Sequence, residues 1–134
     1  MIRFMLDTNA CIAVLNGSPA SVRSRLLKNE PSECVISQVV HVELVYGAFH
    51  SQSPKRNLAR IERLRRYVRV MPWEEEAALA SAQIQNDLAA IGRPIGPYDT
   101  MIAGHAVAQD AILVSHNTRE FGRVGELKLE DWEE

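Results

Sequence analysis

The sequence is poor in cysteine and has no long hydrophobic run. Its two cysteines, Cys11 and Cys34, form neither a CxxC motif nor a spacing typical of metal ligands, so two reduced, partly buried thiols are expected instead of a disulfide. No apolar stretch approaches the length of a membrane span. The N-terminal residues lack the basic start, apolar segment and small-residue cleavage site of a signal peptide. These absences predict a cytoplasmic protein.

Positive charge is not in excess either. The 134 residues carry a formal net charge of −2, with 46% hydrophobic and 24% charged residues. This composition predicts an ordinary globular protein with a single domain over residues 1–134. A role in nucleic-acid binding would therefore need a local basic surface beside a local acidic one.

One stretch does concentrate basic residues, opposed only by Glu62: Lys55, Arg56, Arg60, Arg63, Arg65, Arg66 and Arg69. Within it, Arg60, Arg63 and Arg66 are candidates for contacts with RNA phosphates. The alternative, equally open, is a solvated helix face, because runs of charge usually just face water.

Short apolar runs alternate with segments of helical periodicity along the chain. The runs that indicate strands are residues 2–6, 34–36, 68–71, 111–114 and 127–129. The helical segments are residues 10–16, a segment starting at Pro19, a segment starting near Gln38, residues 58–66, residues 74–91 and a segment starting near Asp99. Ser18 and Ser37 are the expected N-caps of two of these helices, with Pro19 at a first helical position. The alternation predicts an α/β fold with a mainly parallel sheet covered on both faces.

Apolar stripes indicate which helix faces are buried. In the helix after Ser37 the stripe is Val39, Val42, Tyr46 and Phe49, with Glu43 beside it. In the long helix it is Ala77, Ala80, Ile84, Leu88 and Ile91, closed by Gly92. A polar loop is expected at residues 51–57. The small residues Ala103, Gly104 and Ala106 suit close packing of the helix that follows Asp99.

Four polar residues share one kind of position. Asp7 and Asn117 follow strands, and Glu43 and Asp99 are expected on the first turns of helices. Ligands of open α/β sheets bind at the carboxyl ends of the strands. Converging carboxylates repel one another unless a hard cation lies between them, and carboxylate oxygens are what Mg²⁺ or Mn²⁺ prefers. Taken singly, each residue could instead be a helix cap or a surface charge, Asp7 above all.

Four segments together resemble the PIN-domain ribonucleases, and more narrowly the VapC toxins of bacterial type II toxin–antitoxin systems. They are Met5-Leu6-Asp7-Thr8-Asn9, Glu43-Leu44-Val45-Tyr46-Gly47-Ala48, Gly92-Arg93-Pro94-Ile95-Gly96-Pro97-Tyr98-Asp99 and His116-Asn117-Thr118-Arg119-Glu120-Phe121. The closing Leu129-Glu130-Asp131-Trp132 is also typical of that group. The resemblance spans nearly the whole chain. It implies a PIN-like three-layer α/β/α fold and a Mg²⁺-dependent endoribonuclease, with Mn²⁺ as a possible substitute.

The resemblance also implies roles for individual residues. Asp7, Glu43 and Asp99 match the three core acidic residues of the family, which hold the metal. Asn117 stands at the fourth catalytic position, which is often Asp in PIN domains at large. The missing charge puts a second tightly held metal in doubt. The neighbouring polar residues that could position water or phosphate are Thr8, Asn9 and Thr118.

Partners and substrate follow from the same resemblance. It implies inhibition by a VapB antitoxin, through which the complex could bind its own operator DNA. It also implies a homodimer, with apolar surface near the start of the helix of Glu43 or on helix 74–91. The family precedent for the substrate is a structured RNA such as a tRNA anticodon stem-loop, including that of initiator tRNA.

Three other interpretations remain open at this stage. An aspartate-dependent phosphatase could use Asp7 as its nucleophile, although Asn9 stands where those enzymes usually have a second acid. His41-Val42-Glu43 has the H-x-E pattern of zinc deaminases but no Pro-Cys-x-x-Cys follows. A non-catalytic interaction module could use the acidic cluster as a docking site. The histidines His41, His50 and His105 are expected to be ordinary helix residues, and His116 a turn residue beside the site.

Overall fold

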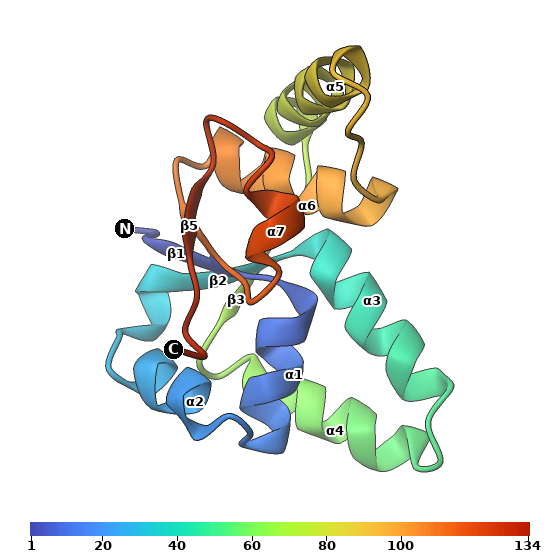
Figure 1. The fold of residues 1–134 in the computed structure, drawn as a ribbon. Helices are drawn as coiled ribbons and strands as arrows, with labels where there is room; N and C mark the ends of the chain where they lie inside the picture. Colours follow the sequence, from blue (N-terminus) through green and yellow to red (C-terminus); the bar gives the residue numbers. More distant parts are fainter.

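Five short strands form one parallel sheet in the order β3-β2-β1-β4-β5, in a computed structural model that describes residues 1–134 (Figure 1). The strands are β1 (Phe4–Leu6), β2 (Cys34–Ser37), β3 (Arg69–Met71), β4 (Ile112–Val114) and β5 (Lys128–Glu130). The central strands β1 and β2 are entirely buried, whereas the edge strands β3 and β5 are partly exposed. A parallel sheet with buried central strands was the predicted class, and it is confirmed.

Helices cover both faces of this sheet. They are α1 (Thr8–Asn16), α2 (Ala20–Leu27), α3 (Gln38–Phe49), α4 (Pro54–Leu64), α5 (Glu75–Ala90), α6 (Pro97–Ala108) and α7 (Thr118–Phe121), with a short 3₁₀ helix at Pro31–Glu33. Figure 1 shows α1, α2 and α4 below the sheet and α5, α6 and α7 above it, while α3 extends outward beside α1 and α4. The three-layer α/β/α architecture is therefore confirmed.

The strand order reverses at β1, and the candidate site lies at this reversal. From β1 the chain moves to β2 and β3 in one direction, then crosses back to β4 on the other side of β1. In the register, Phe4 lies opposite Cys34 on one side and Ile112 on the other. Such a switch point leaves a crevice outside the carboxyl ends of the strands. Asp7 and Ser115 are the residues that follow β1 and β4 there.

One hydrophobic core joins the sheet to its helices. Trp132, near the C-terminus, is buried and packs edge-on against Phe4 of β1, with ring centroids 5.1 Å apart. Cys11 and Cys34 are both free and buried, as expected from their spacing. None of the helices combines the length and the apolar character that spanning a membrane would require.

The predicted cap of α2 is wrong. The backbone N–H of Ser18 donates to the carbonyl of Ala13 at 3.1 Å, and Gly17 adopts the left-handed conformation with φ 67°. Gly17 and Ser18 therefore end α1 together in the manner of a Schellman motif. Pro19, after a cis Ser18–Pro19 bond, has an extended ψ of 144°, so α2 begins at Ala20.

The predicted buried stripe of α3 is also wrong. The buried residues are Val40, Leu44 and Ala48, whereas three residues of the expected stripe, Val42, Tyr46 and Phe49, are 52%, 60% and 59% exposed. The helix carries apolar residues on two faces, and the face with the smaller side chains packs against α1 and α4. The aromatic face is left exposed.

Two smaller features, the start of α4 and the buried face of α5, also differ from the predictions. Helix α4 begins at Pro54, so the polar loop is only residues 51–53 and the first basic residues are helical. In α5 the buried face is Ala77, Ser81, Ile84 and Leu88, while Ile91 at the C-cap is 63% exposed. Gly92 follows with φ 67°, as the expected helix terminator.

Candidate active site

Asp7 lies at the switch point, directly after β1, and its side chain is only 4% exposed. Its carboxylate accepts a hydrogen bond from the backbone N–H of Ala10 at 2.8 Å, so Asp7 is also the N-cap of α1. Burial raises its pKa from 3.8 to about 6. Hydrogen bonds from Ser115 and Ala10 oppose this rise, and the charges of Asp99 and Glu43 add to it. The fold therefore holds an acid that resists ionisation.

Asp99 and Glu43 approach the same place from two helices. Asp99 is on the first turn of α6, as predicted, and its pKa is raised by partial burial and then by the charges of Glu43 and Glu120. Glu43 is the sixth residue of α3, on the second turn instead of the predicted first. The hydroxyl of Thr8 donates a 2.5 Å hydrogen bond to its carboxylate. The fold thus brings the three acids within electrostatic range of one another.

Asn117 stands on the far side of the switch point, between β4 and α7. Its backbone N–H donates to the Ser115 hydroxyl at 2.9 Å, and its side chain makes no hydrogen bond within the protein. Thr118 opens α7 and is exposed, as is Asn9 on the first turn of α1. These amides and hydroxyls are therefore free to meet solvent or a ligand.

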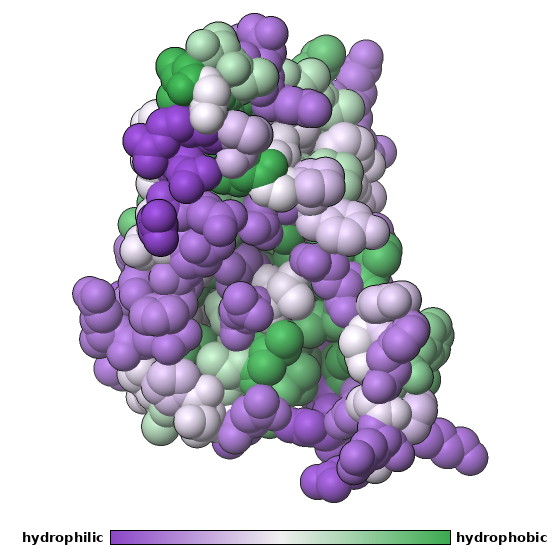
Figure 2. Space-filling model, turned by 45° about the vertical axis from the view of Figure 1, so that its right-hand side comes forward, coloured by the Kyte–Doolittle hydropathy of each residue, from purple (hydrophilic) through white to green (hydrophobic).

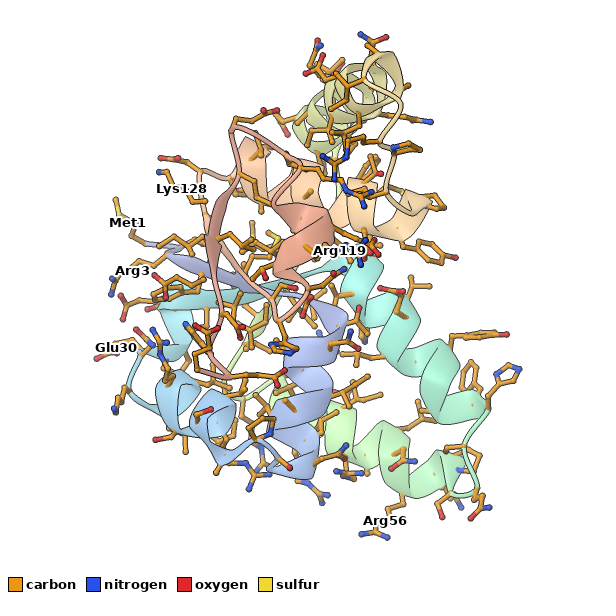
Figure 3. All side chains as sticks on the ribbon, in the orientation of Figure 1. Met1, Arg3, Glu30, Arg56, Arg119 and Lys128 are labelled. Atoms are coloured by element: carbon orange, nitrogen blue, oxygen red, sulfur yellow. The ribbon has the colours of Figure 1, made fainter.

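Sequence reasoning missed three residues at this site. Ser115 is buried and influences Asp7 directly, and its position after β4 mirrors that of Asp7 after β1. Glu120 on α7 adds negative charge near Asp99. Arg119 is exposed and has no ion pair, and Figure 3 places its side chain between α7 and the start of α3. Arg119 is a cation beside an acidic site, which a bound phosphate would contact favourably.

The donor set fits a hard cation, although the ligands are not gathered around a point. No three His, Cys, Asp or Glu side chains lie close enough to form a ready-made metal site. The acids nevertheless present only oxygen donors, and burial, followed by the charges of the neighbouring acids, raises the pKa of Asp7 and of Asp99. A divalent cation would relieve that cost.

The histidines are outside the acidic cluster. His105 is buried in α6, and its Nδ1 lies 2.8 Å from the Ser37 hydroxyl that caps α3. Burial lowers the pKa of His105, which favours its neutral form. Its hydrogen bond with Ser37 connects α6, which carries Asp99, to the N-cap of α3, which carries Glu43. His116 pairs with Asp131 at 2.9 Å, and that hydrogen bond raises its pKa. No zinc-type ligand set accompanies the His41-Val42-Glu43 sequence.

The predicted RNA-binding arginines differ from one another in their contacts. Arg60 donates to the carbonyl of Leu15 at 2.5 Å and to the side chain of Asn16 at 3.2 Å, so it stabilises the end of α1. Arg63 and Arg66 are exposed and make no hydrogen bond or ion pair within the protein. All three lie at the opposite end of α1 from Asp7.

The chain matches a family model described as PIN domain over residues 4–127. It is 51% identical over 132 residues to the tRNA(fMet)-specific endonuclease VapC of Shigella flexneri, covering 98% of this chain and 99% of that protein. The protein of the same name from Salmonella typhimurium is 42% identical with the same coverage.

Solved structures agree with this match. The DNA-bound VapBC of Salmonella typhimurium has a TM-score of 0.93 at 42% identity, over 98% of this chain and 99% of that chain. VapBC2 of Rickettsia felis, bound to a fragment of its promoter, has a TM-score of 0.90 at 32% identity with the same coverage. The resemblance stated from the motifs is confirmed. This chain belongs to the PIN-domain family, among its VapC members.

Proposed function

We propose that this protein is a Mg²⁺-dependent endoribonuclease that cleaves the anticodon stem-loop of initiator tRNA, and that it is the toxin of a VapBC pair. The observation that supports this most is the buried, hard-to-ionise Asp7 at the switch point, with Asp99 and Glu43 beside it. The substrate is inferred from the 51% identical relative named as a tRNA(fMet)-specific endonuclease.

In this proposal Asp7, Glu43 and Asp99 hold the cation, and Mn²⁺ can replace Mg²⁺. When bound, the cation supplies Lewis-acid stabilisation of the scissile phosphate and activates the attacking water. The Thr8 hydroxyl fixes the orientation of the Glu43 carboxylate. Asn117 positions water or phosphate through its amide without adding negative charge, which favours one tightly held cation over two.

Direct attack of water on phosphorus expels the 3′ oxygen, so the products should carry a 5′-phosphate and a 3′-hydroxyl. We expect cleavage of initiator tRNA to stop in EDTA and to return when Mg²⁺ is restored in excess. Mapping the product ends by ligation and by phosphatase sensitivity tests the chemistry. Ends with 2′,3′-cyclic phosphate would show that the ribose 2′-hydroxyl is the nucleophile, and full activity in EDTA would show that no divalent cation is required. Either result would overturn the proposal.

The partner proposed for this chain is a VapB-type antitoxin whose flexible tail lies across the acidic site. An Arg guanidinium there could bind the carboxylates with bidentate hydrogen bonds and take the place of the cation. A cleft of about 220 Å³ adjoins Glu43 and is lined by Ile12, Leu44 and Ile61 among others. Figure 2 shows hydrophobic residues within a hollow low on the face that it presents, flanked by hydrophilic ones.

Expression of the toxin alone should halt growth, and co-expression of the antitoxin should restore it. Replacing the basic residues of the antitoxin tail with Ala should then weaken inhibition of RNA cleavage, and more strongly at high Mg²⁺, because the cation competes for the same carboxylates. The check is an inhibition assay at two Mg²⁺ concentrations. Inhibition that ignores both the substitutions and Mg²⁺ would mean that the antitoxin blocks RNA access sterically.

A homodimer is also proposed, through apolar surface that the fold leaves uncovered. Val42 on α3 is 52% exposed and Leu79 on α5 is 67% exposed. These residues lie on the two helices that the sequence indicated for self-association.

A further inference from the structure

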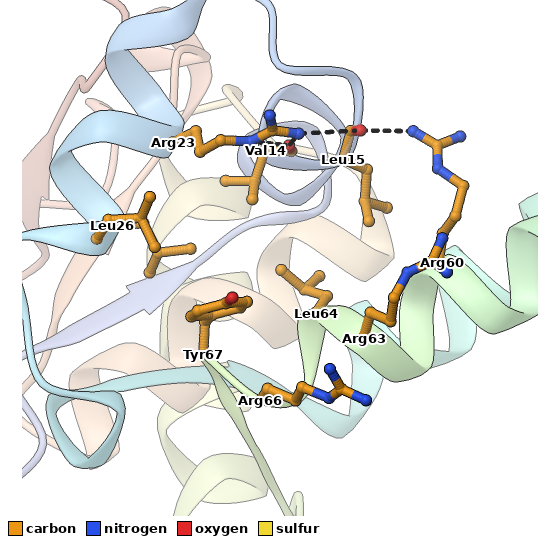
Figure 4. A pocket seen from close by; sticks show the side chains of 10 residues that line it. Val14, Leu15, Arg23, Leu26, Arg60, Arg63, Leu64, Arg66 and Tyr67 are labelled. Carbon is orange, nitrogen blue, oxygen red and sulfur yellow. Dashed lines mark hydrogen bonds between the residues drawn. The ribbon is translucent and has the colours of Figure 1, made fainter.

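A cavity of about 360 Å³ lies where α2, α4 and the end of α1 meet (Figure 4). Four arginines line it, Arg23 from α2, Arg60 and Arg63 from α4, and Arg66 just after α4, and the ring of Tyr67 lies beside them. No acidic residue lines the cavity. In a chain of net charge −2, this is a local concentration of positive charge.

Two of the four guanidinium groups have a structural explanation. Arg23 donates to the carbonyl of Val14 at 2.7 and 3.1 Å, and Arg60 donates to that of Leu15 at 2.5 Å. Figure 4 shows both groups converging on the last carbonyls of α1. Cations are favourable there because a helix C-terminus carries unpaired carbonyls and partial negative charge.

The other two guanidinium groups have no such structural role. Arg63 and Arg66 make no hydrogen bond within the protein and take part in no ion pair, whereas Arg65 between them pairs with Glu62 at 3.3 Å. Two fixed and two unpaired guanidinium groups therefore face one cavity. Such an arrangement binds anions through charge-assisted, often bidentate hydrogen bonds, and phosphate is the anion that guanidinium geometry matches well.

The apolar and aromatic residues of the lining favour a nucleotide over other phosphate compounds. Six of its ten residues are hydrophobic, and Tyr67 is 45% exposed. Apolar and aromatic surface beside cations is what an unstacked base and its phosphate need, as in proteins that bind single-stranded nucleic acid. Its volume of about 360 Å³ is at the lower end of the range for small-ligand pockets, which suits a single nucleotide.

Helix α1 connects this cavity to the acidic site. It begins beside Asp7 and ends with the carbonyls that Arg23 and Arg60 bind. Its nine residues span about 13 Å at the usual rise of an α-helix. An RNA that reaches both places must therefore extend beyond the scissile bond.

We propose that this arginine cavity is a second RNA subsite, which binds a phosphate and an unpaired base remote from the bond that is cleaved. The inference rests on the proposed ribonuclease function. It assigns Arg63 and Arg66 to phosphate contacts and Tyr67 to base stacking, and it makes the length of the RNA a determinant of affinity.

The test uses the double variant Arg63→Gln/Arg66→Gln in the full chain. Binding to tRNA is measured by fluorescence anisotropy over a series of salt concentrations, with Asp7→Asn also present to prevent cleavage. The slope of log affinity against log salt should become shallower by about 0.7 to 0.9, because Arg63 and Arg66 together neutralise the one phosphate of this subsite. In the cleaving protein, KM for tRNA should rise about tenfold or more with kcat unchanged. KM for an oligonucleotide too short to reach the cavity should not change.

The matched control is Arg56→Gln/Arg65→Gln, which removes the same charge from α4 and its C-cap at residues that do not line the cavity. It should leave the salt slope nearly unchanged. Tyr67→Leu should weaken tRNA binding without changing the slope, because stacking carries no charge. A circular dichroism spectrum of each variant verifies the fold.

Equal losses in the two double variants would mean that only the general charge of α4 matters, and this would overturn the inference. So would an unchanged salt slope in Arg63→Gln/Arg66→Gln, which would point instead to an acidic protein segment as the ligand of the cavity. Failure of the proposed function is a different result, because the unmodified protein would then not cleave RNA at all.

Discussion

We expect Asp7→Asn to abolish RNA cleavage and, without divalent metal, to raise the free energy of unfolding at neutral pH. The carboxylate is buried and close to two other acids, so its ionised form is costly until a cation binds. Asparagine removes the charge yet can still accept the N-cap hydrogen bond from Ala10, since Asn caps helices as well as Asp. The metal-free gain should be about 1 to 3 kcal/mol, given about 1.4 kcal/mol for each tenfold change in acidity.

The stability effect has a definite pH dependence. The pKa of Asp7 is about 6 in the folded protein against an ordinary 3.8, so in this range the folded state keeps a proton that the unfolded chain loses. The contribution of Asp7 to stability therefore falls as pH rises from about 4 to about 6. The gain from Asp7→Asn should be near zero at pH 4 and complete above pH 6. Urea unfolding in EDTA at pH 4, 5 and 7 measures it.

Mg²⁺ supplies the complementary control. It should raise the melting temperature of the unmodified protein, because the cation binds the folded form, and it should do so far less for Asp7→Asn. Glu75→Gln removes an exposed acid on the first turn of α5 and should retain both cleavage and the Mg²⁺ effect. Cleavage at the unmodified rate by Asp7→Asn would remove Asp7 from the proposed site.

The positions of Asp7 and Asn117 could be predicted because local chemistry marks strand ends. In both places an apolar run stops at turn-forming polar residues, and the carboxyl edge of a parallel sheet then gathers them. Glu43 was harder to place, because its helix is apolar on two faces. Periodicity fits Val42, Tyr46 and Phe49 as well as it fits the face that is buried, and only packing against α1 and α4 decides between them.

Contacts that sequence patterns do not reveal, one local and the others between distant segments, account for the features that could not be predicted. Ser18 is a residue type suited to an N-cap, but its N–H closes the preceding helix instead. Arg60 could be recognised only as a charge in a basic stretch, since its partner Leu15 is 45 residues away. The cavity that separates Arg63 and Arg66 from Arg65 likewise depends on how α4 meets α1 and α2. Sequence patterns therefore predict the helices, the strands and the candidate acidic residues. Which arginines line the cavity depends on how the helices pack.

A second large effect is expected at Gly104, where α6 crosses α5. A Cβ on Gly104 would lie 2.6 Å from the backbone nitrogen of Ser81 and 2.7 Å from its Cα. Those atoms belong to the backbone of α5 and cannot rotate away, so Gly104→Ala must push the two helices apart. We expect a loss of about 3 kcal/mol or more in the free energy of unfolding, because overpacking a tight contact outweighs the roughly 1 kcal/mol that Ala gains over Gly in a helix.

The displacement should also reach the acidic site, since α6 carries Asp99 on its first turn. Gly47→Ala is the matched control, because Gly47 is in α3 and a Cβ there would meet nothing within 4 Å. It should stabilise the protein by up to about 1 kcal/mol. Adding Ser81→Gly to Gly104→Ala removes the Oγ clash at 2.0 Å but leaves the backbone clash, so it should restore only part of the loss. Urea unfolding of the four proteins gives the comparison. If Gly104→Ala were as stable as the unmodified chain, α5 and α6 would not pack as closely as described, and the placement of Asp99 beside Asp7 would need another cause.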